Sequence, residues 1–358
     1  MDFILKEALK NSNAEQNIED GLAGQATIKI VGAGGAGNNA ADWLYRKGIK
    51  GAEIIAINTD KRHLDARESD IKILIGKECT RGLGAGGFPE KGTEAAQEDI
   101  SEIKATLKDT DMIFLIAGMG GGTGTGAAPV IAQTAKDMGA IVIGVVTMPF
   151  KIERARLDKA ELGLEKLRQY SDTVIVIDNN RLVDIAGNLP ITQAFAVANE
   201  LISTMIKGIV ETIAIPSLVN LDYADVKAIM TQGGVSVIGV GESDTENRVE
   251  EAVKKAMLNP LLDVNYEGAT GALLHITGGP DLTLEEVNRV GESVTKGLDQ
   301  DAQVIWGARI DESMAGKIRV MIIVTGVHSP FIVGPQQKVN SKVQRQKFSE
   351  DLGIRMIN

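Results

Sequence analysis

The stretch Gly118-Met119-Gly120-Gly121-Gly122-Thr123-Gly124-Thr125-Gly126 decides the fold. It follows the most apolar segment of the chain, DMIFLIAG at 111–118, and precedes a helical pattern over about 125–138. Glycines so closely spaced are costly in conformational entropy, and they suit a loop whose successive N–H groups surround an anion. The side chains of Thr123 and Thr125 can add hydroxyl donors. The stretch therefore predicts a buried strand, a phosphate-binding loop and a helix.

A second glycine-rich loop, Gly32-Ala33-Gly34-Gly35-Ala36-Gly37, follows a predicted strand and opens another helical stretch. Its glycine spacing is typical of dinucleotide-binding loops. One alternative is therefore an NAD-dependent oxidoreductase, in which Asp60, after the next strand, would bind a ribose. That alternative gives the loop at 118–126 no role, and the chain lacks the GK[ST] of a P-loop. Two phosphate-type loops favour one polyphosphate held between them.

Apolar strands alternate with helical patterns around these loops. The strands are predicted at 27–32, 53–58, 71–76, 111–118, 141–147 and 173–178, with further helices at 90–108 and 157–170. Because these strands are apolar on both faces, we expect an α/β fold with a Rossmann-like parallel sheet covered on both sides.

A long helical pattern at 191–214 is apolar nearly all round, which predicts a central helix buried between two bodies. A second α/β unit follows, with strands at 235–241, 271–277, 303–309 and 318–325 and helices at 246–258 and 283–298. The expected division is an extension at 1–25, a first domain at 26–190, the central helix at 191–215, a second domain at 216–327 and a flexible tail at 328–358.

Composition excludes several classes of protein. The net charge of −10 argues against nucleic-acid binding, which usually needs a basic face. Cys79 is the single cysteine, so an internal disulfide is impossible, and no Cys/His cluster has zinc spacing. No apolar run reaches the roughly 18 residues of a membrane helix, and the first residues do not form a signal peptide. We therefore expect a cytoplasmic protein without direct membrane insertion.

Two further segments carry polar groups typical of a phosphate site. Thr80-Arg81-Gly82-Leu83-Gly84-Ala85-Gly86-Gly87-Phe88-Pro89 is either a flexible loop near a terminal phosphate or a surface loop. Asn220-Leu221-Asp222-Tyr223-Ala224-Asp225 places two acids three residues apart. Alone, these acids would be read as a helix cap. Beside the glycine loops, they can orient and polarise a water that attacks a phosphoryl group.

At these places the chain resembles FtsZ, the prokaryotic relative of tubulin. GGGTGTG at 120–126 matches the tubulin/FtsZ signature, and NLDYAD at 220–225 matches the family's synergy loop. INTD at 57–60 and TRGLGAGG at 80–87 also fit, and they are more similar to archaeal than to bacterial members. The resemblance covers about residues 27–327. It implies a GTP-binding first domain joined by the central helix to a GTPase-activating second domain.

The resemblance also implies roles for single residues. The nucleotide contacts would come from the first loop and its neighbourhood (Gly34, Gly35, Ala36, Gly37, Asn38, Asn39, Asn58), the second loop (Gly120, Gly121, Gly122, Thr123, Gly124, Thr125, Gly126), the ribose and phosphate pair Glu153 and Arg156, and the base-binding residues Asn179, Phe195 and Asn199. Asp222 and Asp225 would act on the γ-phosphate of a neighbouring subunit, with Asn220 shaping the loop. No side chain is expected to ligate a metal, since Mg²⁺ would be held mainly by phosphates and water.

The implied function is GTP hydrolysis to GDP by a subunit of a head-to-tail filament in the cell-division ring at mid-cell. The tail would bind a membrane-anchoring division protein. The chain departs from the family in three places, one of which is the tail, which lacks the clear bacterial docking motif. The segment Glu153-Arg154-Ala155-Arg156 is one residue short, so Arg154 is an alternative to Arg156, and Phe88 replaces the usual Asn. A filament protein that controls cell shape, or one that binds GTP without turnover, remains an alternative.

Overall fold

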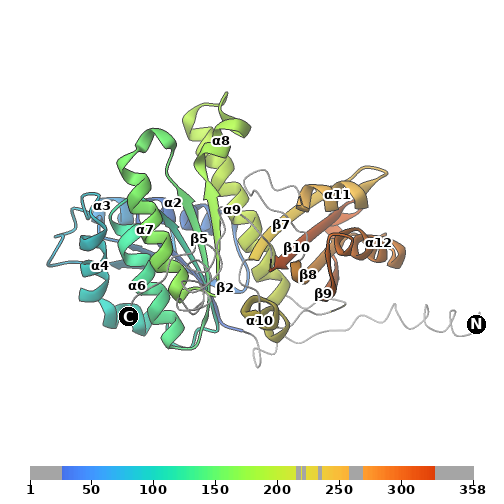
Figure 1. Ribbon diagram of the computed structural model, residues 1–358, viewed down its shortest axis with the longest axis horizontal. Coiled ribbons are helices and arrows are strands. Elements are labelled where there is room, and N and C mark those ends of the chain that lie inside the picture. The colour runs from blue at the N-terminus through green and yellow to red at the C-terminus, as the bar shows by residue number, and fades with distance from the viewer. Residues whose placement is uncertain (1–25, 215–218, 220–222, 233–235, 258–268, 327–358) are drawn as a thin grey trace, which may run out of the picture.

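The computed structural model describes residues 26–214, 219, 223–232, 236–257 and 269–326. The predicted extension at 1–25 and tail at 328–358 lie outside the described residues, as do Asn220 and Asp222. Two α/β parts lie side by side, with a long helix between them (Figure 1).

Six parallel strands form the first sheet, in the order β3-β2-β1-β4-β5-β6. They are β1 (Ile28–Ala33), β2 (Ala52–Asn58), β3 (Ile71–Leu74), β4 (Met112–Gly118), β5 (Ile141–Met148) and β6 (Thr173–Asp178). The central strands are buried almost throughout, because both of their faces are apolar and both are covered by helices. The predicted Rossmann-like parallel sheet is confirmed.

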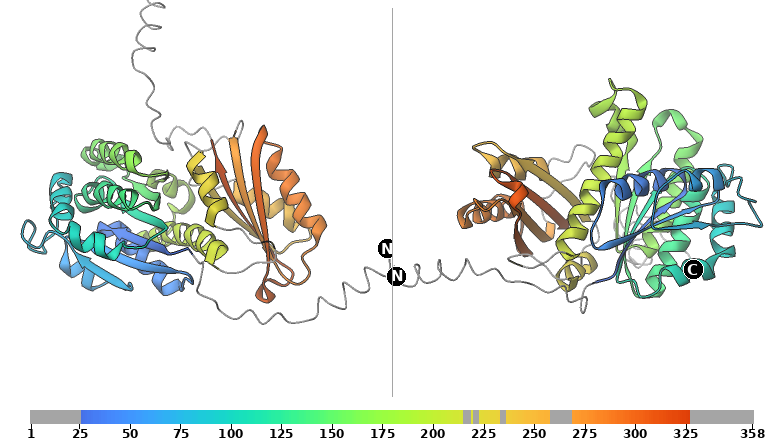
Figure 2. Two further views of the ribbon diagram at one scale, coloured as in Figure 1. Left: turned by 90° about the horizontal axis from the view of Figure 1, so that it is seen from below. Right: turned by 180° about the vertical axis from the view of Figure 1, so that it is seen from behind.

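Helices cover the two faces of this sheet. α2 (Gly34–Lys47) and α9 (Ile191–Ala214) lie on one face, and α4 (Pro89–Glu98), α6 (Thr123–Asp137) and α7 (Ala155–Tyr170) lie on the other (Figures 1 and 2). The strand order reverses between β1 and β4, so α2 leaves β1 toward one side of the sheet and α6 leaves β4 toward the other. Such switch points open a crevice at the carboxyl ends of the strands, where ligands bind.

Local capping explains the helices that hydrophobic periodicity did not predict. The predicted helix at 90–108 is two helices, α4 and α5 (Ile100–Thr106), because Asp99 leaves the helical conformation and its carboxylate accepts a bond from Gly76 N at 2.7 Å. Asp60 caps the short α3 (Lys61–Asp65), and Asp178 caps α8 (Asn179–Ala186). Both caps are side-chain acceptors for free N–H groups of the first turn.

The central helix α9 has two environments. Its second half is buried between the two parts, as predicted, through Ile202, Met205, Ile206 and Ile209. Its first turns extend beyond the sheet beside α8 (Figure 1), and there Ile191 is 72% exposed. The prediction of a fully buried helix is therefore wrong for this end.

The second part has a four-stranded mixed sheet in the order β7-β10-β8-β9. β10 (Ile318–Thr325) is antiparallel to β7 (Ser236–Ser243) and β8 (Ala269–Gly278), whereas β9 (Leu298–Ile310) is parallel to β8. The helices here are α10 (Tyr223–Gln232), α11 (Arg248–Met257) and α12 (Leu284–Thr295). Across the described part of the chain, no helix combines the length and apolar character needed to cross a bilayer.

Candidate functional site

Two glycines of the predicted loops face open space at the carboxyl edge of the first sheet. A Cβ built on Gly121 would have no atom within 4 Å, and one built on Gly35 would meet only His63 Nε2, at 3.9 Å. Both residues line the same cavity, which has a volume of about 270 Å³. The N-termini of α2 and α6 begin beside it, so free backbone N–H groups and two favourable helix dipoles meet there. This half of the site suits a phosphate chain.

The other predicted glycines bring backbone segments close together. A Cβ on Gly124 would lie 2.7 Å from the carbonyl oxygen of Gly118, and one on Gly34 would lie 2.7 Å from Gly124 N. The same crowding occurs at Gly37 against β4, at Gly120 against the first turn of α7, and at Gly126 against α4. Of these glycines, Gly124 also lines the cavity, whereas Gly34, Gly37, Gly120 and Gly126 do not.

A charged pair lies at the rim of the phosphate half. Arg156 Nη1 donates to Glu153 Oε2 at 2.6 Å, and Glu153 Oε1 accepts a bond from Phe150 N at 3.0 Å. Both Glu153 and Arg156 line the cavity, whereas Arg154 does not. Arg154 instead occupies the N-cap of α7 with a φ of 28°. The geometry therefore favours Arg156 as the arginine of this site.

The second half of the cleft is a cavity of about 280 Å³ that continues from the first. The two halves share Ala36, Thr147 and Asn179. The remaining lining residues are Asn39, Ala40, Ile116, Ala117, Phe195, Ala198, Asn199 and Ile202. Apolar walls with three amides suit a planar base with polar edges.

One buried polar atom in this second half lacks a partner. Asn39 Oδ1 is inaccessible to solvent and has no hydrogen bond within the described residues. A buried acceptor of this kind costs about 1–3 kcal/mol when it is left unsatisfied. The ring of Phe195 meets that of Phe150 edge to face, with centroids 6.2 Å apart, which holds the aromatic wall in place. The residues present therefore fit a bound nucleotide whose base would reach Asn39.

Three predicted contact residues have other roles in the structure. The Asn38 amide is buried, and with its nitrogen facing inward its two N–H groups are shared among the carbonyl oxygens of Gly32, Gly34 and Ile57, which lie 2.7–3.0 Å away. Asn58 Oδ1 accepts bonds from the two backbone N–H groups that follow it, and so it shapes the turn after β2.

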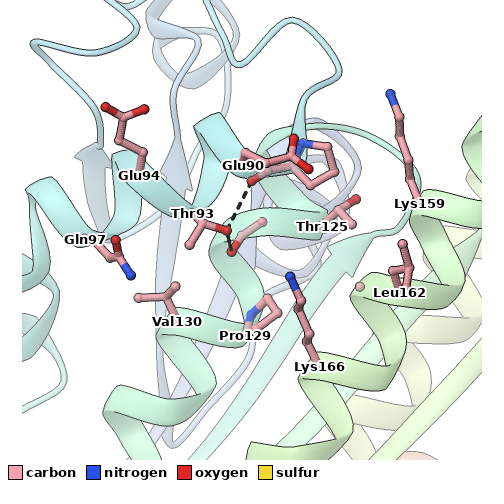
Figure 3. Close-up of a pocket in the computed structure, with 13 residues that line it drawn as sticks. Glu90, Thr93, Glu94, Gln97, Thr125, Pro129, Val130, Lys159, Leu162 and Lys166 are labelled. Carbon is pink, nitrogen blue, oxygen red and sulfur yellow. Dashed lines mark hydrogen bonds between the residues drawn. The ribbon is translucent and has the colours of Figure 1, made fainter.

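The third of these residues is Thr125, which is only 2% exposed. A Cβ on Gly163 of α7 would collide with its methyl group, and its side chain lines a separate groove between α4, α6 and α7 (Figure 3). Its hydroxyl is buried without a hydrogen-bond partner among the described residues, and Thr125 does not line the phosphate half.

The loop Thr80–Pro89 borders the phosphate half, which sequence alone did not decide. A Cβ on Gly122 would lie 2.7 Å from the Cβ of Ala85 and 3.0 Å from Phe88 N. Gly84 N donates to Thr59 O at 3.1 Å, and Lys159 Nζ donates to Gly87 O at 2.9 Å. The Phe88 ring, 56% exposed, lies over the same lysine at 5.4 Å.

Sequence reasoning missed Thr147 and the small apolar residues of the base half. Thr147 stands near the end of β5, and its carbonyl accepts a bond from Met119 N at 2.9 Å. The one available signal was the position of a polar residue at the end of the strand next to β4, since parallel strands present their carboxyl ends at one edge. Asp60, which would bind a ribose in the NAD alternative, instead caps α3 by accepting a hydrogen bond from His63 N.

The described end of the predicted acidic segment, from Tyr223 onward, lies at the opposite edge of the sheet. Tyr223, the first residue of α10, donates its hydroxyl to the carbonyl of Asp111 at 2.8 Å, and Asp111 immediately precedes β4. Val219 is paired through its backbone with Ala308 of β9. Asp225, in the first turn of α10, therefore lies near the start of β4, whereas the phosphate loop lies at its end. Seven residues of strand at about 3.3 Å each separate the two by roughly 20 Å.

The fold and the cleft together define a nucleotide-binding protein with a two-part, tubulin-like architecture. Residues 27–187 match the model for the Tubulin/FtsZ family, GTPase domain, and residues 234–328 match that for the FtsZ family, C-terminal domain. The chain therefore belongs to the Tubulin/FtsZ family and carries its GTPase domain.

Relatives extend the match over nearly the whole chain. Cell division protein FtsZ 2 of Methanocaldococcus jannaschii is 55% identical over 98% of this chain and 94% of its own length. Cell division protein FtsZ 2 of Halobacterium salinarum is 54% identical over 98% of this chain and 90% of its own length. A solved structure of an M. jannaschii FtsZ dimer, empty, is 47% identical, covers 94% of this chain and 98% of its own, and has a TM-score of 0.80. CetZ2 from Haloferax volcanii, 22% identical with a TM-score of 0.72 over 92% of this chain and 100% of its own, shares the fold.

Proposed function

We propose that the cleft at the carboxyl edge of the first sheet binds GTP, and that hydrolysis occurs where two subunits meet head to tail. The chain is a GTP-hydrolysing, filament-forming member of a family of cell-division proteins. The main support for a site shared between two subunits is that the cleft and Asp225 are separated by the length of β4 within one subunit. We assign nucleotide binding to residues 26–190 and activation of hydrolysis to residues 216–327, with the central helix at 191–215 between them.

In this assignment the base occupies the half of the cleft between α2 and α9. Guanine offers an N1–H and an amino group as donors and O6 as an acceptor, and the amides of Asn179 and Asn199 each carry both kinds of group. Phe195 packs against the ring. Asn39 lines this half of the cleft, so its side chain would lie beside the base.

The phosphates occupy the other half of the cleft. Backbone N–H groups from Gly121 to Thr125 and from the start of α2 surround them, and Arg156 approaches with its charge while Glu153 faces the ribose. Mg²⁺ neutralises phosphate charge when bound, held mainly by phosphate oxygens and water.

Catalysis needs the next subunit along the filament. Asp222 and Asp225 of that subunit would orient a water for in-line attack on the γ-phosphate and accept its proton, and Asn220 would shape the loop that carries them. A head-to-tail contact of this kind is heterologous, and it generates open filaments rather than closed dimers.

Exposed apolar side chains around the cleft support this contact. Leu83 is 83% exposed, Ile152 87% and Ile191 72%, and each lies in a segment that follows the carboxyl end of a strand. Large exposed apolar side chains of this kind are often covered by a partner protein. The cleft would thus be covered by the neighbouring subunit.

We further propose a cytoplasmic protein at the mid-cell division site, where the tail at 328–358 binds a membrane-anchoring division protein. This part of the proposal rests on the relatives named as cell division proteins and on the resemblance of the chain to FtsZ. A tagged copy imaged in dividing cells tests it. A ring at the septum supports division, and patches along the cell side would favour control of cell shape.

The test of the shared site is the concentration dependence of phosphate release. GTPase activity per subunit should rise steeply above a threshold protein concentration, because isolated subunits hold only half of each site. Asp222→Ala should bind GTP normally and hydrolyse it very slowly. Full activity in dilute monomer would show that one chain holds a complete site.

A further inference from the structure

The base half of the cleft has walls from distant parts of the chain. Asn39 belongs to α2, which begins at the phosphate loop, whereas Phe195 and Asn199 belong to α9, which leads to the second domain. Hydrogen bonding to both edges of one base requires these two helices to keep a fixed spacing. A feature that fixes the spacing would therefore control which base is accepted.

Four polar side chains join the two helices just beyond the base half; we call them the α2–α9 clamp. Glu200 Oε2 accepts a bond from Trp43 Nε1 at 2.9 Å, and Glu200 Oε1 accepts one from Lys47 Nζ at 2.5 Å. Lys47 Nζ also donates to Thr204 Oγ1 at 2.9 Å. One acidic side chain on α9 thus holds two successive turns of α2.

The clamp continues the faces that line the cleft. Trp43 and Lys47 follow Asn39 at intervals of four residues, so all three lie along one stripe of α2. On α9, Glu200 is the residue directly after Asn199. The two helices lie side by side on the same face of the sheet (Figure 2, right). A change at the clamp is therefore transmitted to the pocket over about one helical turn.

Glu200 is held as a carboxylate. Burial alone would raise its pKa, but the hydrogen bonds from Lys47 and Trp43 outweigh that effect, and the pKa lies below its ordinary value. Bonds to a charged acceptor are roughly twice as strong as neutral ones. Solvent weakens them here, because the side chain of Glu200 is half exposed.

The next attachment between these helices lies farther from the cleft. Lys207 Nζ donates to the carbonyl of Gly48, beyond the end of α2, at 2.8 Å and pairs with Glu211 at 3.6 Å. That attachment is two turns farther along α9. The first turns of α9 are exposed, so the clamp is the polar attachment to α2 that lies nearest to Phe195 and Asn199.

We propose that Glu200 is a positioning residue for base selection, holding α2 and α9 at the spacing at which Asn39 and Asn199 reach the two edges of one guanine. The inference rests on the proposed guanine-nucleotide function of the cleft. Release of the clamp lets α9 move away from α2, and the bonds specific to guanine lengthen. Contacts to ribose and phosphate, which every nucleoside triphosphate shares, stay as they are.

The test compares GTP and ATP affinity at protein concentrations too low for assembly. Glu200→Ala should lower the ratio of ATP to GTP dissociation constants about tenfold, almost entirely through weaker GTP binding, since two bonds to a charged group are lost. Trp43→Phe removes one donor and keeps an aromatic ring, so it should lower the ratio by less. Glu200→Gln keeps a hydrogen-bond acceptor, so its ratio of ATP to GTP dissociation constants should be close to that of the wild type.

Glu211→Ala is the matched control, because it removes an acid that pairs with a lysine on the same helix away from the cleft. It should leave the ratio unchanged. If the clamp only stabilised the fold, Glu200→Ala would lower the melting temperature and weaken GTP and ATP equally. Equal ratios in wild type, Glu200→Ala and Trp43→Phe would overturn the inference. A wild-type protein that binds ATP as tightly as GTP would instead overturn the proposed function.

Discussion

Two inactive variants of this chain should restore GTP hydrolysis when they are mixed. Asp225→Ala keeps the nucleotide cleft and loses part of the acidic loop. Gly121→Val keeps the loop and fills the phosphate half, since no atom lies within 4 Å of a Cβ at Gly121 and the added side chain projects into the cavity. Gly124 is a poorer choice for this variant, because a Cβ there would strike the backbone of Gly118.

The size of the effect follows from the geometry. Within one subunit the cleft and Asp225 are separated by roughly 20 Å of β4, far beyond hydrogen-bond reach. Asp225→Ala alone should therefore lose about a hundredfold or more of its turnover, the usual contribution of a general base. Gly121→Val alone should also be inactive, because its side chain fills the phosphate half of the cleft. In an equal mixture that assembles at random, half of the lower subunits have an intact cleft and half of the upper subunits have an intact loop. About one quarter of the head-to-tail contacts are then complete, so about one quarter of wild-type activity should return.

The assay is phosphate release across mixing ratios at constant total protein, with pelleting to measure co-assembly. Activity should peak at equal amounts and vanish at either extreme. Gly291→Val is the matched control, since a Cβ there also meets no atom within 4 Å but lies on α12, far from the cleft along the chain. Co-assembled filaments without recovered activity would refute the shared site, and so would full activity of Asp225→Ala alone.

Three further outcomes are expected. ATP should bind at least about a hundredfold more weakly than GTP, a difference of roughly 2.7 kcal/mol, because adenine leaves the amides of Asn179 and Asn199 unpaired; competition binding measures this. Tyr223→Phe should reduce turnover about fivefold with GTP affinity unchanged, because one hydrogen bond of about 1 kcal/mol to the start of β4 is lost. Steady-state kinetics measure this, with the exposed Tyr45→Phe as the control. A weaker GTP affinity in Tyr223→Phe would contradict the assignment. Burial and nearby Arg309 lower the pKa of His275 to about 4, so on acidification the unfolded chain takes up this proton before the folded chain does. The free energy of unfolding should therefore decline as pH falls from about 6.5 toward 4. His275→Leu should show a smaller decline over the same pH range.

Periodicity and glycine spacing were sufficient to predict most of the first sheet and both of its loops. They were insufficient to separate glycines that face a ligand from glycines that allow close packing. Gly121 and Gly126 stand in one motif, yet the first borders open space and the second packs against α4. That difference depends on which backbone approaches from elsewhere in the chain.

The other residues of the cleft could not be predicted from the sequence, because they come together only in the folded chain. Thr147 and Ile202 line it through their places on elements that meet only in three dimensions, and neither belongs to a local motif. The mixed pairing of the second sheet was also beyond sequence reasoning, because the apolar pattern of a strand does not identify the neighbours with which it pairs. The predicted contacts of Asn38 and Asn58 came from resemblance alone, and the structure gives both residues internal bonds.

In the proposed shared site, the cleft and Asp225 stand at opposite ends of β4, so every polymer of this chain would have unlike tips. At one tip the last subunit offers a cleft that no acidic loop covers, and at the other tip an acidic loop has nothing to act on. The nucleotide at the uncovered tip is spared from hydrolysis until another subunit arrives. Short polymers therefore retain a larger share of their GTP than long ones. Hydrolysis in each subunit can begin only when the next subunit covers its cleft. The rate of subunit addition would therefore set when GTP hydrolysis begins at each contact.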